Sequence, residues 1–491
     1  MSHEWTFPAA KSDDLPKSPW SETLTFLDPV HGSDRVIDDA VIVVPGIMGT
    51  ELIDIDTEKR LWGLDPGLIA RMWTAPTNRL TPLAVDPERT TVRPGRLLRA
   101  PTFAPFLRGI EPYTELVRGL ERIVRHPAAV YEFGYDWRLP VRHNALLLAE
   151  VIDAHLQWWR RESKRPEARV HLVAHSMGGL LCHELSANPG ATDNVGEIIT
   201  LGTPFKGAPK AIVMLGTGEG APLPARQLQR IAVTMPGLYD LLPSFRCVDT
   251  GTDVRLLTPS DITAIGGRGD LAEAALAHRA ERATVLMPDH RPVVGVEQPT
   301  LCSLKINSGR VEGQRHAFAF GWAGVQRDAA GAPLREMIFG DGTVPRNSAL
   351  TPGKLILTKE DRNKMHVLPQ QHGPLAKAQS AITFVRDVLL NLDADLGPQM
   401  GAGDLGIDTP DVVTVGSEFD IGVEGAAKPN DIRCTVTEIG TRLPRRAEAH
   451  CRDGRLLVSS TVYEPGLYRV EVAGSGNSAV EQIIMAVDTD R

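Results

Sequence analysis

Three polar residues, Ser176, Asp341 and His372, stand in the order and local settings that catalysis by a serine nucleophile requires. A serine hydroxyl is a poor nucleophile until a neighbouring imidazole accepts its proton, and a buried carboxylate can fix the tautomer and orientation of that imidazole. Ser176 lies in the stretch AHSMGG, Asp341 in the glycine turn GDGTVP, and His372 in QQHGPLAK. We therefore take Ser176 as the candidate nucleophile, His372 as the candidate base and Asp341 as the orienting carboxylate.

The candidate nucleophile is expected to lie where a strand turns into a helix. The preceding run, VHLVAH at 170–175, predicts a buried strand, and a helical pattern follows the serine. A serine in such a strained turn presents its hydroxyl above the edge of the sheet if small residues two positions before and after it let the backbones pass. Ala174 and Gly178 meet this need. The alternative is an ordinary strand-turn-helix junction that uses Gly178 and Gly179 only for close packing.

A second glycine turn could supply the donors that bind an oxyanion. The apolar run 40–44 predicts a strand buried on both faces, and it leads directly into a Pro-Gly turn. In serine hydrolases of this kind, the loop after an early strand gives one backbone N–H to the oxyanion hole, and the residue after the serine gives the other. We assign these donors to Ile47 and Met177. The alternative is a tight turn that merely needs Gly46 and Gly49.

Further polar residues in or near predicted strands could have either catalytic or structural roles. His366 lies within a predicted strand at 365–368 and is the rival candidate for the catalytic base. Asp136 and Arg138, in VYEFGYDWR, are predicted to lie together at the end of a strand. They could contact substrate, but a local ion pair is the simpler interpretation.

Composition excludes several classes of partner and cofactor. The net charge is −8, from 53 basic and 61 acidic side chains without a basic stripe, which argues against a nucleic-acid partner. No apolar stretch approaches the roughly 18 residues that span a bilayer, and the first residues lack the pattern of a signal peptide. Five scattered cysteines indicate reduced thiols, and they show no metal-ligand spacing. We therefore expect a cytoplasmic protein without metal or cofactor.

The order of predicted elements indicates an α/β fold with a parallel sheet flanked by helices. Two segments interrupt this order and are interpreted as cap insertions; the second is either a mobile apolar cover, as in a lipid enzyme, or an ordinary packed insertion. Beyond a Gly- and Asp-rich linker, short extended runs separated by turn residues predict a small all-β sandwich. The predicted divisions are an N-terminal arm at 1–37, an α/β domain at 38–393 with caps near 54–112 and 208–243, a linker at 394–408 and a β-sandwich domain at 409–491.

Five stretches resemble the lecithin:cholesterol acyltransferase family of α/β hydrolases, which includes lysosomal phospholipase A2 and plant phospholipid:diacylglycerol acyltransferases. They read VPGIMGTEL, GYDWR, AHSMGG, LGTPFKGAPKA and GDGTVP. The resemblance covers roughly residues 38–393 and implies the α/β-hydrolase fold, acyl-ester chemistry on lipids, and triad positions for Ser176, Asp341 and His372. The animal acyltransferases hold their first cap with a disulfide, whereas residues 54–112 contain no cysteine here.

The predicted function is hydrolysis of acyl esters, with phospholipids or other long-chain esters as substrates by resemblance. The alternatives are acyl transfer to an alcohol acceptor and a non-catalytic lipid-binding scaffold, because an acyl-enzyme does not dictate which nucleophile attacks it. The predicted contacts are a peripheral membrane surface at the caps and a protein partner at residues 409–491. That C-terminal module is either such a docking module or a passive appendage, and its deletion is expected to leave the hydrolysis of small esters largely unchanged.

Overall fold

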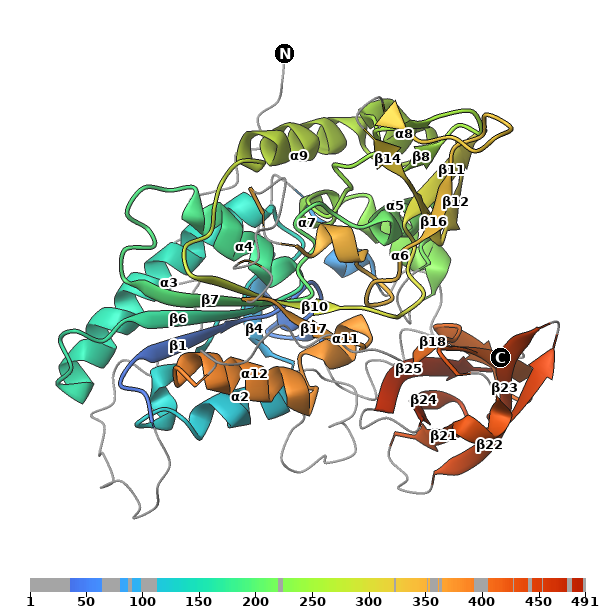
Figure 1. Cartoon of the computed structure of the whole chain (residues 1–491). Coiled ribbons are helices and arrows are strands. Elements are labelled where there is room, and N and C mark those ends of the chain that lie inside the picture. Colours follow the sequence, from blue (N-terminus) through green and yellow to red (C-terminus); the bar gives the residue numbers. More distant parts are fainter. Residues whose placement is uncertain are drawn as a thin grey trace.

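The computed structural model of the chain is organised around a six-stranded sheet whose neighbouring strands are all parallel (Figure 1). Its order is β17-β10-β7-β6-β1-β5. Because parallel neighbours need crossover connections, helices lie between these strands in the sequence. The strands are β1 (Ala40–Val44), β5 (Val130–Glu132), β6 (Val170–His175), β7 (Val195–Leu201), β10 (His290–Gly295) and β17 (His366–Leu368).

The structure describes most of the chain. The described residues are 36–63, 80–86, 91–98, 113–219, 224–321, 324–350, 352–353, 361, 364–392, 405–426, 428–439, 444–452, 454–474 and 479–488. Most of the predicted N-terminal arm, much of the predicted first cap and most of the predicted linker therefore lie outside the described residues.

Helices cover both faces of the parallel sheet (Figure 1). α3 (Val141–Ser163) and α4 (Met177–Ser186) pack together on one face, and α2 (Thr114–Glu121) and α12 (Gln379–Leu389) pack together on the other. Every residue of β1 and β6 is buried, as expected for strands that are covered on both faces. This burial explains the continuous apolar run of β1 in the sequence.

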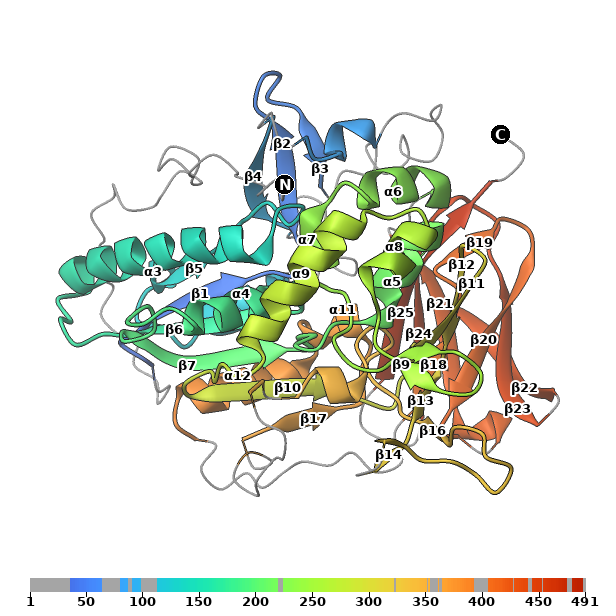
Figure 2. The same ribbon diagram turned by 90° about the horizontal axis from the view of Figure 1, so that it is seen from above.

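The two predicted cap segments contain regular structure. In the first, β3 (Arg60–Trp62) and β4 (Val92–Leu97) pair antiparallel with β2 (Thr50–Asp54), the strand that ends where this segment begins. The second is helical, with α5 (Pro209–Thr217), α6 (Ala225–Ala232) and α7 (Pro236–Tyr239). Helices α8 (Pro259–Ala264) and α9 (Gly269–Arg282) follow, and α5 packs on α6 and α8 while α9 packs on α7 and α8 (Figure 2). The second segment is thus a packed helical insertion.

Short strands between α7 and α8, and between β10 and β17, form three smaller sheets. One four-stranded sheet has the order β12-β11-β8-β9, and two hairpins pair β13 with β16 and β14 with β15. Their bounds are Val248–Asp249 (β8), Val254–Arg255 (β9), Ser303–Asn307 (β11), Arg310–Gln314 (β12), His316–Phe318 (β13), Phe320–Gly321 (β14), Gly324–Val325 (β15) and Arg335–Met337 (β16).

The C-terminal strands form a separate all-β unit of eight strands, which we call the C-terminal sheet. Its order is β18-β20-β23-β22-β21-β24-β25-β19. The first residues of β22 pair with β21 and its later residues pair with β23, so this strand joins the two halves of the sheet. The strands are β18 (Gly406–Asp408), β19 (Val412–Thr414), β20 (Glu418–Glu424), β21 (Arg433–Glu438), β22 (Arg445–Arg452), β23 (Arg455–Thr461), β24 (Gly466–Ala473) and β25 (Ala479–Val487).

The C-terminal sheet has its own apolar core, made by residues from both halves, such as Ile421, Val458, Val470 and Ile484. The predicted fold class, an α/β-hydrolase fold with a separate all-β C-terminal part, is thus confirmed. Residues 406–408 differ from their assignment to the linker, because they pair with β20 as strand β18. The other domain divisions stay a prediction.

Three local predictions differ from the structure. The predicted strand at 130–138 ends at Glu132, because the chain then turns away from β1. The amphipathic pattern of residues 374–392 predicts one long helix, but the structure divides this part of the chain into α11 (His372–Leu375) and α12. Asp341 does not follow a strand of the central sheet: the strand before it, β16, belongs to a hairpin, and Gly340 and Asp341 form isolated bridges with Gln298 instead.

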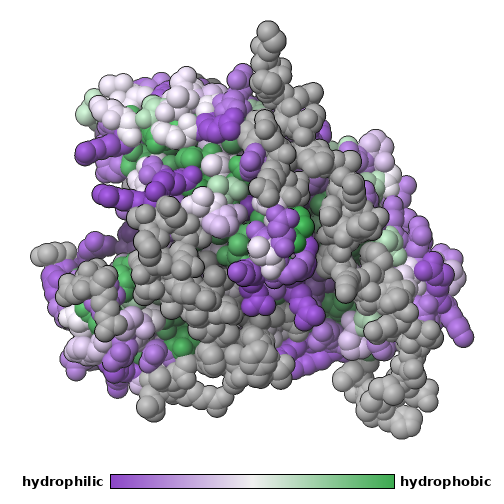
Figure 3. Space-filling model, turned by 180° about the vertical axis from the view of Figure 1, so that it is seen from behind, coloured by the Kyte–Doolittle hydropathy of each residue, from purple (hydrophilic) through white to green (hydrophobic). Residues whose placement is uncertain are grey.

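On the face opposite to that shown in Figure 1, hydrophobic and hydrophilic residues are mixed. Outside the areas drawn in grey, hydrophobic residues show there as separate areas between hydrophilic ones (Figure 3). None of the described helices combines the length and apolar character needed to cross a bilayer. All five cysteines are free thiols, as their spacing indicated.

Candidate active site

Ser176 lies in the sharp turn between β6 and α4, as the sequence predicted. Its φ of 54° and ψ of −125° are unusual for a residue with a side chain, which is the strain expected at a nucleophile elbow. A Cβ at Gly178 would lie 2.5 Å from the carbonyl oxygens of Val44 and Pro45, so only glycine fits there. The tight packing of α4 against the end of β1 therefore depends on the glycine that the motif supplies.

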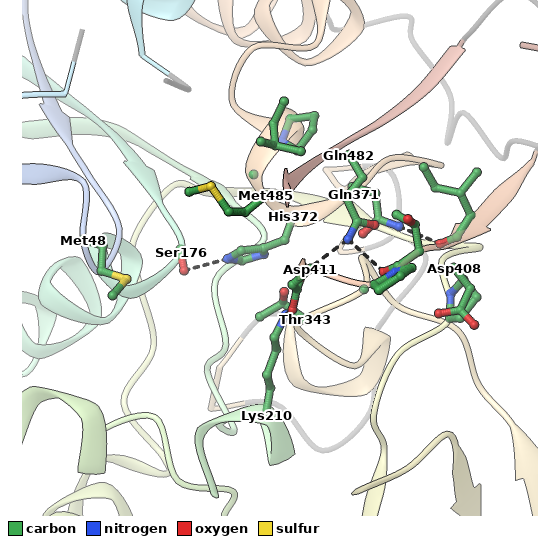
Figure 4. A pocket seen from close by; sticks show the side chains of 18 of the residues that line it. Met48, Ser176, Lys210, Thr343, Gln371, His372, Asp408, Asp411, Gln482 and Met485 are labelled. Carbon is green, nitrogen blue, oxygen red and sulfur yellow. Dashed lines mark hydrogen bonds and ion pairs between the residues drawn. The ribbon is translucent and has the colours of Figure 1, made fainter. Parts of the chain in front are cut away.

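The structure brings Ser176, His372 and Asp341 together. The Oγ of Ser176 lies 2.8 Å from Nε2 of His372 (Figure 4). Nδ1 of His372 lies 2.7 Å from Oδ2 of Asp341. Ser176 is 5% exposed and Asp341 only 1% exposed. The carboxylate favours a proton on Nδ1, which leaves Nε2 free to accept the serine proton.

Backbone groups fix the carboxylate of Asp341. Its Oδ1 accepts hydrogen bonds from the backbone N–H groups of Thr343, at 3.0 Å, and Val344, at 2.6 Å. The backbone N–H of His372 donates to the carbonyl oxygen of Asp341 at 2.7 Å. Two donors thus hold Oδ1 while Oδ2 faces the imidazole, so the carboxylate cannot rotate without losing hydrogen bonds.

The two predicted oxyanion donors lie beside the serine. Met177 is the first residue of α4, and Ile47 lies with Ser176 on the wall of the same cavity. A Cβ at Gly46 would lie 2.8 Å from the Cβ of Ser176, so the loop after β1 closely approaches the nucleophile. Among the described residues, neither the Ile47 nor the Met177 amide donates a hydrogen bond within the protein. Within the described part of the chain, both amides are therefore available to a ligand.

A buried chain of hydrogen bonds, which the sequence analysis missed, links the loop after β1 to the loop that carries His372. Tyr113 Oη accepts from the backbone N–H of Gly46 at 2.8 Å and donates to His175 Nδ1 at 3.0 Å. His175 Nε2 then carries the ring proton and donates to the carbonyl oxygen of His372 at 3.0 Å. Burial, together with the nearby His372 charge, lowers the pKa of His175 to about 3, so its ring is neutral.

A cavity of about 990 Å³ opens at Ser176 and His372 (Figure 4). It is lined by the loop after β1, by α5 of the second cap segment, by the loops before β11 and around His372, and by the C-terminal sheet. Charged side chains at its wall form ion pairs, such as Arg315 with Asp408 at 2.6 Å and Lys377 with Glu481 at 2.8 Å. Its apolar lining includes Ile47, Met48, Leu98, Val213, Leu301 and Met485.

The structure decides two alternatives that the sequence left open. Asp136 and Arg138 form a buried ion pair, with 2.7 Å between Arg138 Nη2 and Asp136 Oδ2, and neither lines the cavity. The local ion pair is therefore confirmed. His366 stacks on Phe384 of α12, with 4.8 Å between ring centroids, whereas the hydrogen bond to Ser176 comes from His372. His366 as the rival base is therefore wrong.

Other residues that the sequence analysis missed stand beside recognised motifs. His175 directly precedes Ser176, and Gln370 and Gln371 directly precede His372. Their polar side chains, buried next to a candidate site, are the signal that could have found them, since buried polar groups need partners. Nothing in the sequence identified those partners.

Comparisons with known proteins give a family match and distant structural likenesses. No curated protein sequence matches the chain. Among solved structures, the Tle4-Tli4 complex gives a TM-score of 0.46 at 16% identity, over 73% of this chain and 99% of that one. A Bacillus licheniformis lipase, BlEst2 in its propeptide form, gives 0.32 at 11% identity, over 93% and 95%. Phospholipase PlaB from Legionella pneumophila gives 0.22 at 11% identity, over 76% and 86%. Because all three TM-scores lie below 0.5, we base no conclusion on these likenesses.

The family match is made by residues 76–260, which fit the model of the lecithin:cholesterol acyltransferase family. This segment includes the nucleophile elbow, the Asp136–Arg138 pair and the second cap segment. Over these residues the chain is therefore similar to the lecithin:cholesterol acyltransferase family, the family that its motifs resemble.

Proposed function

We propose that this protein is a serine hydrolase of acyl esters whose substrates are lipids such as phospholipids. One observation carries the proposal: the hydrogen-bonded chain from Ser176 through His372 to Asp341 opens into a cavity of about 990 Å³ with a partly apolar wall. The serine supplies the nucleophile, and the apolar wall suits an acyl chain. The family match supports lipid esters as the substrate class.

In the first half-reaction, Ser176 Oγ attacks the ester carbonyl carbon while His372 Nε2 takes the hydroxyl proton. Asp341 stabilises the imidazolium that forms, and the amides of Ile47 and Met177 donate to the carbonyl oxygen as it becomes an oxyanion. The C–O bond to the alcohol then breaks, and His372 gives its proton to the leaving oxygen. Ser176 is left as an acyl ester.

In the second half-reaction, water attacks this acyl-enzyme with His372 as the general base, and the fatty acid leaves. An alcohol in the same place would give a new ester instead. The family match favours this acyl transfer as the second candidate function, because the family is named for it. Mass spectrometry of the products from a phospholipid mixture, with and without an alcohol acceptor, distinguishes free fatty acid from a new ester.

The test of the serine mechanism uses the Ser176→Ala variant. We expect a fluorophosphonate probe to label the parent protein at Ser176 and the variant not at all. Turnover of a short acyl ester is expected to fall by about 10⁶-fold, because the members of a triad act as a unit. Near-parental activity of the variant would overturn the serine mechanism. Failure of the probe to label the parent would favour the non-catalytic scaffold.

The remaining predictions about partners and location are part of this proposal. Contact with a lipid surface is assigned to the cap segments, because α5 of the second cap lines the cavity. A protein partner at residues 409–491 and a cytoplasmic location are kept as predicted, and so are the domain divisions apart from residues 406–408. Binding to phospholipid vesicles, measured by sedimentation, tests the lipid contact.

A further inference from the structure

The two residues before His372 are hydrogen-bonded to the C-terminal sheet. Gln371 Nε2 donates to the carbonyl oxygen of Ile407 in β18 at 2.9 Å. Gln370 Nε2 donates to the carbonyl oxygen of Ala479, the first residue of β25, at 3.2 Å. Gln370 Oε1 accepts from the N–H of its neighbour Gln371 at 2.9 Å. The loop between β17 and α11 therefore lies against two strands of the C-terminal sheet.

A third glutamine, Gln298, joins this contact to the loop of Asp341. Gln298 is 0% exposed, and its backbone exchanges two hydrogen bonds with Gly340, at 3.0 and 3.2 Å. Its Oε1 accepts from Gln371 Nε2 and from the N–H of Ile407, both at 3.1 Å. Its Nε2 donates to the carbonyl oxygen of Leu405 at 2.9 Å.

One buried residue thus contacts the loop before Asp341 through its backbone, and the loop before His372 and the first strand of the C-terminal sheet through its side-chain amide. Because a buried polar group without a hydrogen-bond partner is unfavourable, these partners strongly favour the observed arrangement. The C-terminal sheet also supplies part of the cavity wall. Gln482 and Met485 of β25 lie in the same cavity as Ser176 and His372 (Figure 4).

From these contacts we infer that the C-terminal sheet forms part of the active site. It holds the loop of His372 in place through Gln298, Gln370 and Gln371. The inference rests on the proposed function. It replaces both interpretations drawn from the sequence, the docking module and the passive appendage, as the primary role of this sheet. It also reverses the expectation for small esters, because loss of these contacts would release the loop of the catalytic base.

The test weakens the contact in the full chain without removing the C-terminal sheet. Gln371→Glu keeps the shape of the side chain but replaces a donor with an acceptor that faces the oxygens of Ile407 and Gln298. Gln370→Ala removes the contacts to β25. The matched control is Gln379→Glu, the same exchange at an exposed position eight residues further on, at the start of α12.

Turnover of a short acyl ester is measured per active site, counted with a fluorophosphonate probe, together with the pH profile of kcat/KM and the unfolding temperature. We expect kcat to fall by about 10- to 100-fold in both variants, since small displacements of a catalytic group have effects of this size. The limb of the pH profile that reports His372 is expected to move, and the control to match the parent. A purely structural contact would lower the unfolding temperature only.

The outcomes separate this inference from the proposed function. If both variants unfold cooperatively and keep the parental kcat and pH profile, the inference is overturned and the serine hydrolase stands. If neither variant folds, the contacts serve folding rather than alignment, which also overturns it. A parent that the probe does not label overturns the proposed function, and the inference with it.

Discussion

Replacement of Asp341 by asparagine tests how the triad is oriented. Oδ1 of Asp341 is held by the N–H groups of Thr343 and Val344, so the amide oxygen of an asparagine would take that position. Its NH₂ group would then replace Oδ2, which lies 2.7 Å from Nδ1 of His372. An NH₂ group can only donate, so Nδ1 must become an acceptor and the ring proton must move to Nε2. In that tautomer His372 cannot take the proton of Ser176.

The expected loss in kcat is about 10⁴-fold, the size found for this exchange in other serine triads. It corresponds to about 5 kcal/mol of transition-state stabilisation, at 1.36 kcal/mol for each factor of ten. The assay is turnover of a short acyl ester by folded protein, whose state is checked by circular dichroism. The control is His366→Gln, which changes a buried histidine outside the triad and is expected to keep the parental kcat. A loss below about tenfold for Asp341→Asn, or an equal loss in the control, would refute the assignment.

Two further predictions concern stability. Burial lowers the pKa of His155 to about 4, against 6.5 for an exposed ring, so the unfolded chain binds a proton more readily and is favoured as the pH falls from 6.5 towards 4. His155→Gln removes this group, so the unfolding temperature of the variant should fall less than that of the parent between pH 7 and pH 4.5. An equal fall in both proteins would contradict this. Asp136→Ala leaves the buried guanidinium of Arg138 without its carboxylate. The free energy of unfolding, measured with urea, should fall by about 3–5 kcal/mol, while turnover per folded molecule is retained. An unchanged unfolding midpoint would show that the ion pair does not stabilise the fold.

The sequence by itself determined the features that arise between close neighbours in the chain. The elbow at Ser176 could be predicted because its steric needs fall on residues two positions away, and Gly178 indeed packs where a Cβ would not fit. The all-apolar β1 indicated a strand covered on both faces for the same reason, since burial acts on each residue of the run. The order of the serine, the aspartate and the histidine in the chain then indicated a catalytic triad.

Elements without a local signal were missed. β22 has the sequence RRAEAHCR, and none of its residues is buried. Only the small residues Ala447, Ala449 and Cys451 alternate with polar ones, so its apolar signal is weak. It is a strand because both of its edges pair, with β21 and with β23. Such pairing is decided by the partners and not by the strand's own residues. The strand β18 was not predicted either, because its three residues follow a stretch with the composition of a linker.

Only the tertiary structure decided which groups surround the triad. It placed His372 rather than His366 at Ser176, and it joined Gln371 to Gln298, which is 73 residues away in the chain. It also connected His175 to the carbonyl oxygen of His372 across 197 residues. A hydrogen bond needs its donor and acceptor within about 3 Å, and a separation along the chain says nothing about that distance until the sheet has formed. For this reason the sequence indicated the candidate catalytic residues, while the fold determined which groups surround them.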